Sequence, residues 1–150
     1  MTPIDFQVTV DCADPHRLAH FWAAALGYDD ENHEPLIRGL LEAGVAGEAD
    51  VIDVDGRLRW RTAAAIRHPD DPPFGSPESG RARRILFQVV PEPKVVKNRW
   101  HLDLNVGRDR VDAEVDRLKG LGASELYRIS EASGSHTTMA DPEGNEFCVQ

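Results

Sequence analysis

The sequence predicts a mixed α+β fold made of two βαβββ modules, residues 1–92 and 93–150, within one domain of 150 residues. Polar and apolar residues alternate strictly over residues 99–106, which indicates a strand with one buried face. The order of a strand, a helix ending in Leu-Gly and three further strands occurs twice along the chain. A unit used twice predicts a pair of half-barrels, with helices covering one face and a cleft lined by the other.

The first module opens with a strand over residues 6–12, in which polar and apolar residues alternate. A helix follows, because Asp14 suits the N-cap and Pro15 suits the first helical position, where its missing N–H costs nothing. Gly27 ends this helix, since glycine readily adopts the left-handed conformation. The rest is expected as a short strand from Tyr28, a helix over 36–45, a hydrophilic turn over 50–56, a strand over 59–67, an exposed loop over 68–83 and a buried strand over 85–90.

The second module repeats this order after the strand at residues 99–106. Its helix is expected over residues 109–121, with acidic side chains near the start and Lys119 near the end, both favourable to the helix dipole. Gly122 closes this helix as Gly27 closes the first. Strands are then expected over 126–129 and 136–140, followed by a turn over 141–145 and a last strand over 146–150.

The polar face of the strand at residues 99–106 is the first candidate site. His101, Asp103 and Asn105 point to one side, because they alternate with apolar residues. Such groups hold metals or orient small polar ligands, although an ordinary exposed face with a hydrogen-bonded histidine fits the same pattern. Gln7 has the matching place in the first module, so duplication predicts one convergent binding site. The apolar face is formed by Trp100, Leu102, Leu104 and Val106.

Composition argues against several classes of function. The formal net charge is −9 and the pI is about 5.0, and the chain has no basic stripe of the kind that nucleic acid requires. No apolar run approaches the roughly 20 residues of a membrane span, and the N-terminus does not have the pattern of a signal peptide. Cys12 and Cys148 form no CxxC pair, which indicates reduced thiols. We therefore expect an acidic, cytoplasmic protein.

Two motifs connect the sequence to a known family. HLDLNV begins with His101, and ADPEGNEFCV lies near the end of the chain. With the order βαβββ–βαβββ, these motifs resemble the vicinal oxygen chelate superfamily, which includes glyoxalase I, extradiol dioxygenases, and fosfomycin and bleomycin resistance proteins. The run VPEPKVVKNRWHLDL is most similar to glyoxalase-like proteins of unassigned activity. The resemblance covers nearly the whole chain and implies the glyoxalase/bleomycin resistance/dioxygenase fold.

The resemblance also implies a set of four positions in the cleft. Metal-using members of the superfamily place His or Gln, Glu, His and Glu there. These positions fall on Gln7, Gln88, His101 and Cys148. His101 matches fully and Gln7 matches a known variant, whereas Gln88 and Cys148 replace the two carboxylates.

This replacement changes the chemistry expected of the site. Mg²⁺ and Mn²⁺ need charged oxygen ligands, so the set requires no such cofactor. It admits Zn²⁺, because Cys148 as a thiolate and His101 are ligands that zinc accepts. We assign metal binding to His101 alone, and general acid–base catalysis to His101 and His136, since alternation puts His136 and Thr138 on one strand face. The expected ligand-binding residues are Gln7, Gln88, Asp103, Asn105 and Cys148.

Two functions remain open at this point. The first is a glyoxalase-like enzyme with lyase, isomerase or dioxygenase activity on a small molecule in the cleft. The second is a non-catalytic protein that sequesters a ligand, as antibiotic-resistance relatives do. The missing carboxylates favour the second, whereas the many enzymes in the superfamily favour the first. The resemblance further implies a homodimer, and no residue pattern selects a particular substrate.

Overall fold

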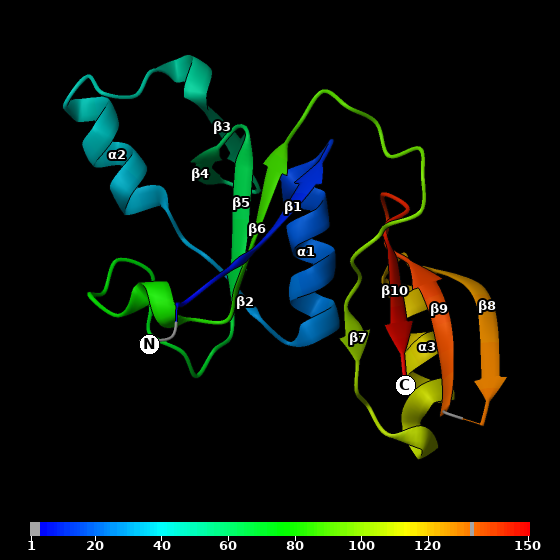
Figure 1. The fold of residues 1–150 in the computed structure, drawn as a ribbon. Helices are drawn as coiled ribbons and strands as arrows, with labels where there is room; N and C mark the ends of the chain where they lie inside the picture. The colour runs from blue at the N-terminus through cyan, green and yellow to red at the C-terminus, as the bar shows by residue number, and fades with distance from the viewer. Residues whose placement is uncertain (1–3, 133) are drawn as a thin grey trace. The chain divides into compact units, whose positions relative to one another are not determined.

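The computed structural model describes residues 4–132 and 134–150, which form two compact units divided after Pro91. Unit 1 ends at Pro91, and unit 2 begins at Glu92. Each unit holds a four-stranded sheet, and Figure 1 shows both sheets with their helices. The strand orders are β1-β6-β5-β2 and β7-β10-β9-β8, so the topology is the same in the two units. The mixed α+β fold of two βαβββ modules is therefore confirmed.

Unit 1 begins with the elements that the sequence predicts. Asp14 caps the first helix by accepting a hydrogen bond from the Arg17 N–H at 3.0 Å, and Gly27 ends it with a φ of 68°. One face of the sheet packs against this helix, and Ile85 and Phe87 are buried there. The elements are β1 (Val8–Cys12), α1 (Pro15–Leu26), β2 (Asp29–Asp30), β5 (Ala63–Arg67) and β6 (Arg84–Val89).

Between β2 and β5 the chain forms an additional hairpin. The expected helix over 36–45 is α2 (Glu34–Glu42), and the short η1 helix (Glu48–Asp50) follows it. The expected turn over 50–56 is wrong, because β3 (Val51–Val54) pairs there with β4 (Arg57–Trp60). The expected strand over 59–67 is likewise divided between β4 and β5.

The turn of this hairpin explains the error. Asp55 and Gly56 connect β3 to β4 with φ angles of 53° and 77°. A two-residue loop with both φ angles positive is the preferred connection of a tight hairpin, and Asp-Gly is one of its favoured sequences. The local sequence therefore encodes the hairpin through the dipeptide Asp55-Gly56. We predicted a turn without strands there because the segment is hydrophilic.

The strand at residues 99–106 is shorter than its alternation predicts. Only β7 (Asp103–Leu104) is regular strand, although β10 (Glu146–Val149) extends the pairing because the Cys148 N–H donates to the Leu102 carbonyl at 2.9 Å. Trp100 was expected on the buried face, but it is 92% exposed. It lies in the segment after Pro91 and Pro93, ahead of the point where β10 can pair with the chain.

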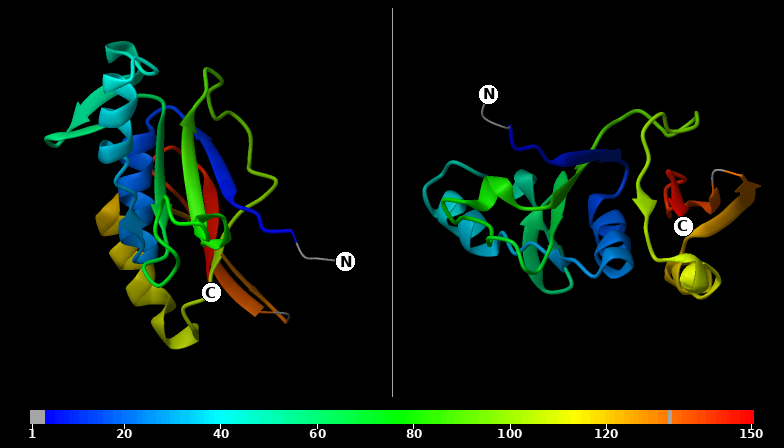
Figure 2. Two further views of the ribbon diagram at one scale, coloured as in Figure 1. Left: turned by 90° about the vertical axis from the view of Figure 1, so that its left-hand side faces the viewer. Right: turned by 60° about the horizontal axis from the view of Figure 1, so that its bottom comes forward.

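Unit 2 otherwise follows the predicted order. The residues 108–110 form the short η3 helix, so the main helix α3 (Val111–Leu121) starts two residues later than expected and ends at Gly122, where φ is 114°. Val115 and Leu118 are fully buried, and α3 covers one face of the sheet (Figure 2). The last two strands before β10 are β8 (Ser124–Glu131) and β9 (Gly134–Ala140).

The helices of the described residues are short. The longest, α1, has 12 residues, and none combines the length and apolar character that a membrane-spanning helix needs.

Candidate ligand cavity in unit 2

A row of polar side chains crosses the unit 2 sheet from one edge to the other. The backbone register places Cys148 of β10 opposite Asp103 of β7 and Thr138 of β9. Thr138 in turn lies opposite Tyr127 of β8. Residues opposite one another point to the same face of a sheet, so four strands contribute to one surface. His101 lies two residues before Asp103 and extends this surface.

This surface is hollowed into a cavity of about 310 Å³. Its volume lies in the range of pockets that hold small organic molecules. The side chains around it are mainly polar, and all of them come from unit 2. They are Lys97, His101, Asp103, Tyr127, His136, Thr138, Glu146, Phe147, Cys148 and Gln150.

His101 and Asp103 form a hydrogen-bonded pair at the wall of the cavity. Nδ1 of His101 lies 2.9 Å from Oδ1 of Asp103. A carboxylate only accepts hydrogen bonds, so Nδ1 carries the proton and Nε2 of the neutral ring keeps a lone pair. Both side chains are partly exposed, at 37% and 44%. The arrangement can therefore orient His101 for proton transfer or for metal binding through Nε2.

Cys148 is a neutral thiol in this environment. Burial raises the pKa of the Cys148 thiol above its usual range, the nearby Asp103 carboxylate adds to this effect, and a contact with Thr138 only partly opposes it. The Sγ atom lies 3.7 Å from Oγ1 of Thr138. A thiolate is needed for nucleophilic attack, so a nucleophilic role for Cys148 is disfavoured.

Three side chains of the cavity could together hold a metal ion. Ligand atoms of His101, Asp103 and Cys148 all lie within 4.8 Å of one another. One nitrogen, one carboxylate oxygen and one sulfur do not fit Mn²⁺ or Mg²⁺, which prefer several oxygen ligands. The same three donor types fit Zn²⁺, which accepts nitrogen, oxygen and sulfur ligands.

Glu146 is a cavity residue that our sequence analysis missed. Its carboxylate lies 3.1 Å from Nζ of Lys94 and accepts a hydrogen bond from the Asn98 N–H at 2.9 Å. Burial would raise the pKa of Glu146, but these two partners hold it below its usual range. The signal was present in the last strand, where alternation places Glu146 on the same face as Cys148.

The structure places the other expected unit 2 residues at or beside the cavity. His136 of β9 lies two residues before Thr138 and lines the cavity. Asn105 is exposed beside it and accepts a hydrogen bond at 2.9 Å from Nε2 of Gln150, which also lines it. The expected group of His101, His136, Asp103, Asn105 and Cys148 therefore lies on one side of this sheet.

Gln7 and Gln88 lie in unit 1, and the sheet keeps them apart. Both are exposed on the face that points away from α1, but the register of β1 and β6 places Gln88 opposite Asp11. Gln7 instead accepts a hydrogen bond from Nη1 of Arg84, at 2.8 Å. Arg84 and Gln88 are separated by four residues of one strand, a distance of roughly 13 Å. That the two glutamines join His101 and Cys148 in one site stays a prediction.

The face of unit 1 around Gln7 is occupied by a buried ionic cluster that the sequence did not reveal. Glu31 is 8% exposed, and its carboxylate accepts from Nε of Arg67 at 2.7 Å and from Nε and Nη2 of Arg84, both at 2.9 Å. Nε2 of His33 lies 2.9 Å from Oε2 of Glu31, the oxygen that also accepts from Nη2 of Arg84. Burial alone would raise the pKa of Glu31, but hydrogen bonds from His33 and Arg84 and the charges of both arginines lower it to about 2.

Comparison with known protein families agrees with this architecture. A family model described as a glyoxalase-like domain matches residues 7–150. The chain therefore belongs to the glyoxalase-like domain family, within the vicinal oxygen chelate superfamily. The sequence has no significant match among curated proteins.

Solved structures with the same fold are distant in sequence. A glyoxalase/bleomycin resistance protein/dioxygenase family enzyme from Burkholderia phytofirmans is 15% identical, with a TM-score of 0.58 over 95% of this chain and 94% of its own. A mutant of the fosfomycin resistance protein FosX from Listeria monocytogenes, in complex with Mn(II) and dihydroxypropylphosphonic acid, is 11% identical, with a TM-score of 0.57 over 100% and 90%. A glyoxalase/bleomycin resistance protein from Albidiferax ferrireducens is 15% identical, with a TM-score of 0.52 over 95% and 93%.

Proposed function

We propose that this glyoxalase-like protein binds a small polar molecule in the unit 2 cavity and that His101 takes a proton from it. The observation that carries the proposal is the 2.9 Å hydrogen bond between His101 and Asp103 at the wall of a cavity of about 310 Å³. A base oriented by a carboxylate beside a ligand-sized space is the usual arrangement for general base catalysis. The reaction class that it supports is proton transfer of the lyase or isomerase type.

The side chains around the cavity have separate roles in this proposal. Asp103 holds the proton on Nδ1 of His101, so Nε2 remains free to accept one from the ligand. Tyr127 and Thr138 offer hydroxyl groups that orient a carbonyl or hydroxyl of the ligand. The side chain of His136 has no ion pair or hydrogen bond within the part of the chain that the structure describes, so in its protonated form it is available to donate a proton to the ligand.

We further propose that the metal of this site, when one is bound, is Zn²⁺ held by His101, Asp103 and Cys148. In that form His101 would be a metal ligand, and His136 rather than His101 would be the group available for proton transfer. Zinc would supply a Lewis acid that polarises an oxygen of the ligand. Oxygenase chemistry has less support, because non-haem iron oxygenases use two histidines and one carboxylate, and the metal-binding group contains one histidine.

Binding without turnover is the second function that a specific observation favours. The position at which metal-using relatives have a glutamate carries Cys148, whose raised pKa leaves it neutral as long as no metal is bound. Glu146 is held by Lys94 and by the backbone of Asn98, so it does not take the place of that glutamate. A cavity without a charged metal ligand at this position suits a protein that sequesters its ligand.

Ligand screening with matched variants tests the proposal. A library of small oxygenated metabolites is screened by thermal shift, and the strongest binder is measured by calorimetry against wild type, His101→Leu and His20→Leu. His20 is an exposed histidine of α1 outside the cavity. We expect His101→Leu to abolish binding and His20→Leu to leave it unchanged. Binding that survives in His101→Leu would refute the site, and turnover of the bound ligand would decide between enzyme and sequestering protein.

We also propose that the two units form one domain and that the protein works as a cytoplasmic homodimer. Cys12 and Cys148 are both buried and form no disulfide among the described residues, which agrees with a reducing compartment. Sizing by light scattering across a range of concentrations tests the dimer. A monomer mass at every concentration would contradict it.

A further inference from the structure

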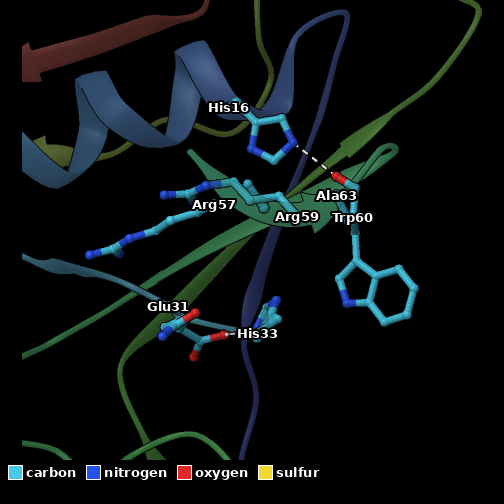
Figure 3. A pocket seen from close by; sticks show the side chains of 9 residues that line it. His16, Glu31, His33, Arg57, Arg59, Trp60 and Ala63 are labelled. Atoms are coloured by element: carbon cyan, nitrogen blue, oxygen red, sulfur yellow. Dashed lines mark hydrogen bonds and ion pairs between the residues drawn. The ribbon is translucent and has the colours of Figure 1, made fainter. Parts of the chain in front are cut away.

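Unit 1 contains a second, much smaller pocket beside Ala63 and Ala64, the first residues of β5, which do not pair with β2. It lies between the first turn of α1, the residues that follow β2 and strand β4 of the hairpin. Its enclosed volume is about 10 Å³, which is room for a single oxygen atom. Figure 3 shows the residues that line it, which are His16, Glu31, Asn32, His33, Arg57, Arg59, Trp60, Ala63 and Ala64.

Two buried nitrogen atoms in the wall of this pocket have no partner. Within residues 4–132 and 134–150, Nδ1 of His16 and Nε of Arg59 are both shielded from solvent and form no hydrogen bond. A buried polar atom without a partner is costly, by about 1–3 kcal/mol, and each one requires an explanation. Two such atoms in one pocket indicate that the pocket has a polar occupant.

The hydrogen-bonding roles of these two atoms are defined by their neighbours. Nε2 of His16 lies 2.8 Å from the Trp60 carbonyl oxygen, which can only accept, so Nε2 carries the proton and Nδ1 is an acceptor (Figure 3). Nε of Arg59 is always a donor. The pocket therefore offers one acceptor and one donor, and a hydroxyl group satisfies both.

The charges around the pocket favour an anion over a water molecule. Arg59 pairs with Asp30 at 2.6 Å, and Asp55 adds a weaker attraction, while Glu31 is already held by two arginines and His33. Arg57 is exposed and has no ion pair among the residues that the structure describes. Its side chain lies beside that of Arg59 below His16 (Figure 3). A single water would satisfy the two buried nitrogens but would leave Arg57 without an anionic partner.

We propose that the unit 1 pocket binds a small oxyanion that carries its own hydroxyl group, such as hydrogen phosphate or an α-hydroxy carboxylate. The hydroxyl enters the enclosed space, donates to Nδ1 of His16 and accepts from Nε of Arg59. The anionic oxygens remain at the mouth, where Arg57 pairs with them. This site is separate from the unit 2 cavity and does not depend on the function proposed there.

Two matched pairs of anions test the proposal and identify the ligand class. Hydrogen phosphate is compared with sulfate, and glycolate with acetate, by calorimetry at constant ionic strength and about pH 8, where an ordinary imidazole is neutral. Within each pair the anions are alike in charge, but only the first has a hydroxyl. We expect the hydroxylated member of at least one pair to bind about tenfold more tightly, since losing a hydrogen bond to a buried group costs about 1.4 kcal/mol or more.

Variants then locate the binding. Arg57→Gln, at an exposed position, should weaken binding of the preferred anion about tenfold, because it removes the positive charge that pairs with the anionic oxygens. Arg38→Gln removes an equally exposed charge that pairs with Glu34 outside the pocket, and it should change nothing. His16→Ala should remove the preference for the hydroxylated anion. Equal binding of both members in each pair, no binding of any anion, or unchanged binding in Arg57→Gln would overturn the proposal.

Discussion

The sheets of the two units have the same strand order, but their polar faces differ in how their charged groups are satisfied. In unit 1, Arg67 and Arg84 both hold Glu31, and Arg84 also donates to Gln7. Arg67 further donates to the carbonyls of Pro72 and Ser79, at 2.9 and 3.0 Å, and so ties the loop over 68–83 to the sheet.

In unit 2 the corresponding face is hollow. His101 and Asp103 pair with each other at its wall, and the side chain of His136 has no hydrogen bond or ion pair within the described residues. A polar group that is already saturated stabilises the fold, whereas one that is partly exposed and unsatisfied is available to a ligand. The comparison teaches that duplication supplies two equivalent sheets, and that the pairing of side chains on each polar face decides whether that face is filled by its own ion pairs or hollowed into a cavity.

The largest effect that we expect comes from breaking the unit 1 cluster. Glu31→Gln leaves Arg67 and Arg84 as buried charges without their shared carboxylate. Removing one partner of a buried ion pair costs about 3–5 kcal/mol, so the free energy of unfolding in urea should fall by this amount. Glu78→Gln, on the exposed loop, should change it by less than about 0.5 kcal/mol. A similar loss in both variants would show that Glu31 does not anchor the unit.

Lowering the pH should weaken the same unit 1 cluster and reduce the stability of the protein. The pKa of Glu31 is about 2 in the folded protein, below its ordinary value of 4.5, so its ionised form stabilises the fold. This contribution, of the order of 3 kcal/mol, is fully present above pH 4.5 and is lost as the pH falls toward 2. Urea denaturation between these pH values should therefore show a steep loss in wild type. If Glu31→Gln shows an equally steep loss, other groups are responsible.

Metal binding at the unit 2 face should change the free energy of unfolding by a smaller amount than the loss of Glu31 from the unit 1 face. Zn²⁺ at ten times its dissociation constant should stabilise wild type by about 1.4 kcal/mol. Mn²⁺ and Mg²⁺ should have little effect, because His101, Asp103 and Cys148 provide one carboxylate only. Thermal denaturation with each metal, compared between wild type and Cys148→Ala, measures this. Tight binding of about one Mn²⁺ per chain that is lost in His101→Ala would contradict it.

The smallest effect on stability is expected at the cavity itself. His101→Leu should change the free energy of unfolding by less than about 0.5 kcal/mol, because the side chain is partly exposed and pairs only with Asp103. Urea denaturation at neutral pH checks this value. A loss above about 2 kcal/mol would mean that His101, like Glu31, belongs to the framework of its unit.

The sequence predicted the elements that are determined by local patterns. Asp14, Gly27 and Gly122 mark helix ends through capping chemistry, and alternation correctly separated the two faces of β1. The errors lie where local and tertiary signals compete. The hydrophilic residues around Asp55-Gly56 were predicted as a turn although they form a hairpin. The residues before 101 alternate in polarity but have no partner strand, so they do not form a strand.

The candidate site was predictable only within one strand or one neighbouring pair. Alternation grouped His101 with Asp103, and the resemblance added Cys148. Glu31 was not among the predicted residues, because nothing near it in the sequence indicates burial between Arg67 and Arg84. The relation between Gln7 and Gln88 depended on the register of two strands far apart in the chain, which no local pattern specifies.

Calorimetry of one ligand against three proteins tests most directly the claim that unit 2 binds and that the unit 1 cluster stabilises. The ligand found by screening is titrated into wild type, His101→Leu and Glu31→Gln at a temperature where all three remain folded by circular dichroism. We predict that His101→Leu loses binding while keeping its stability, and that Glu31→Gln keeps wild-type affinity despite its lower stability. Full binding in His101→Leu, or lost binding in Glu31→Gln, would contradict the account.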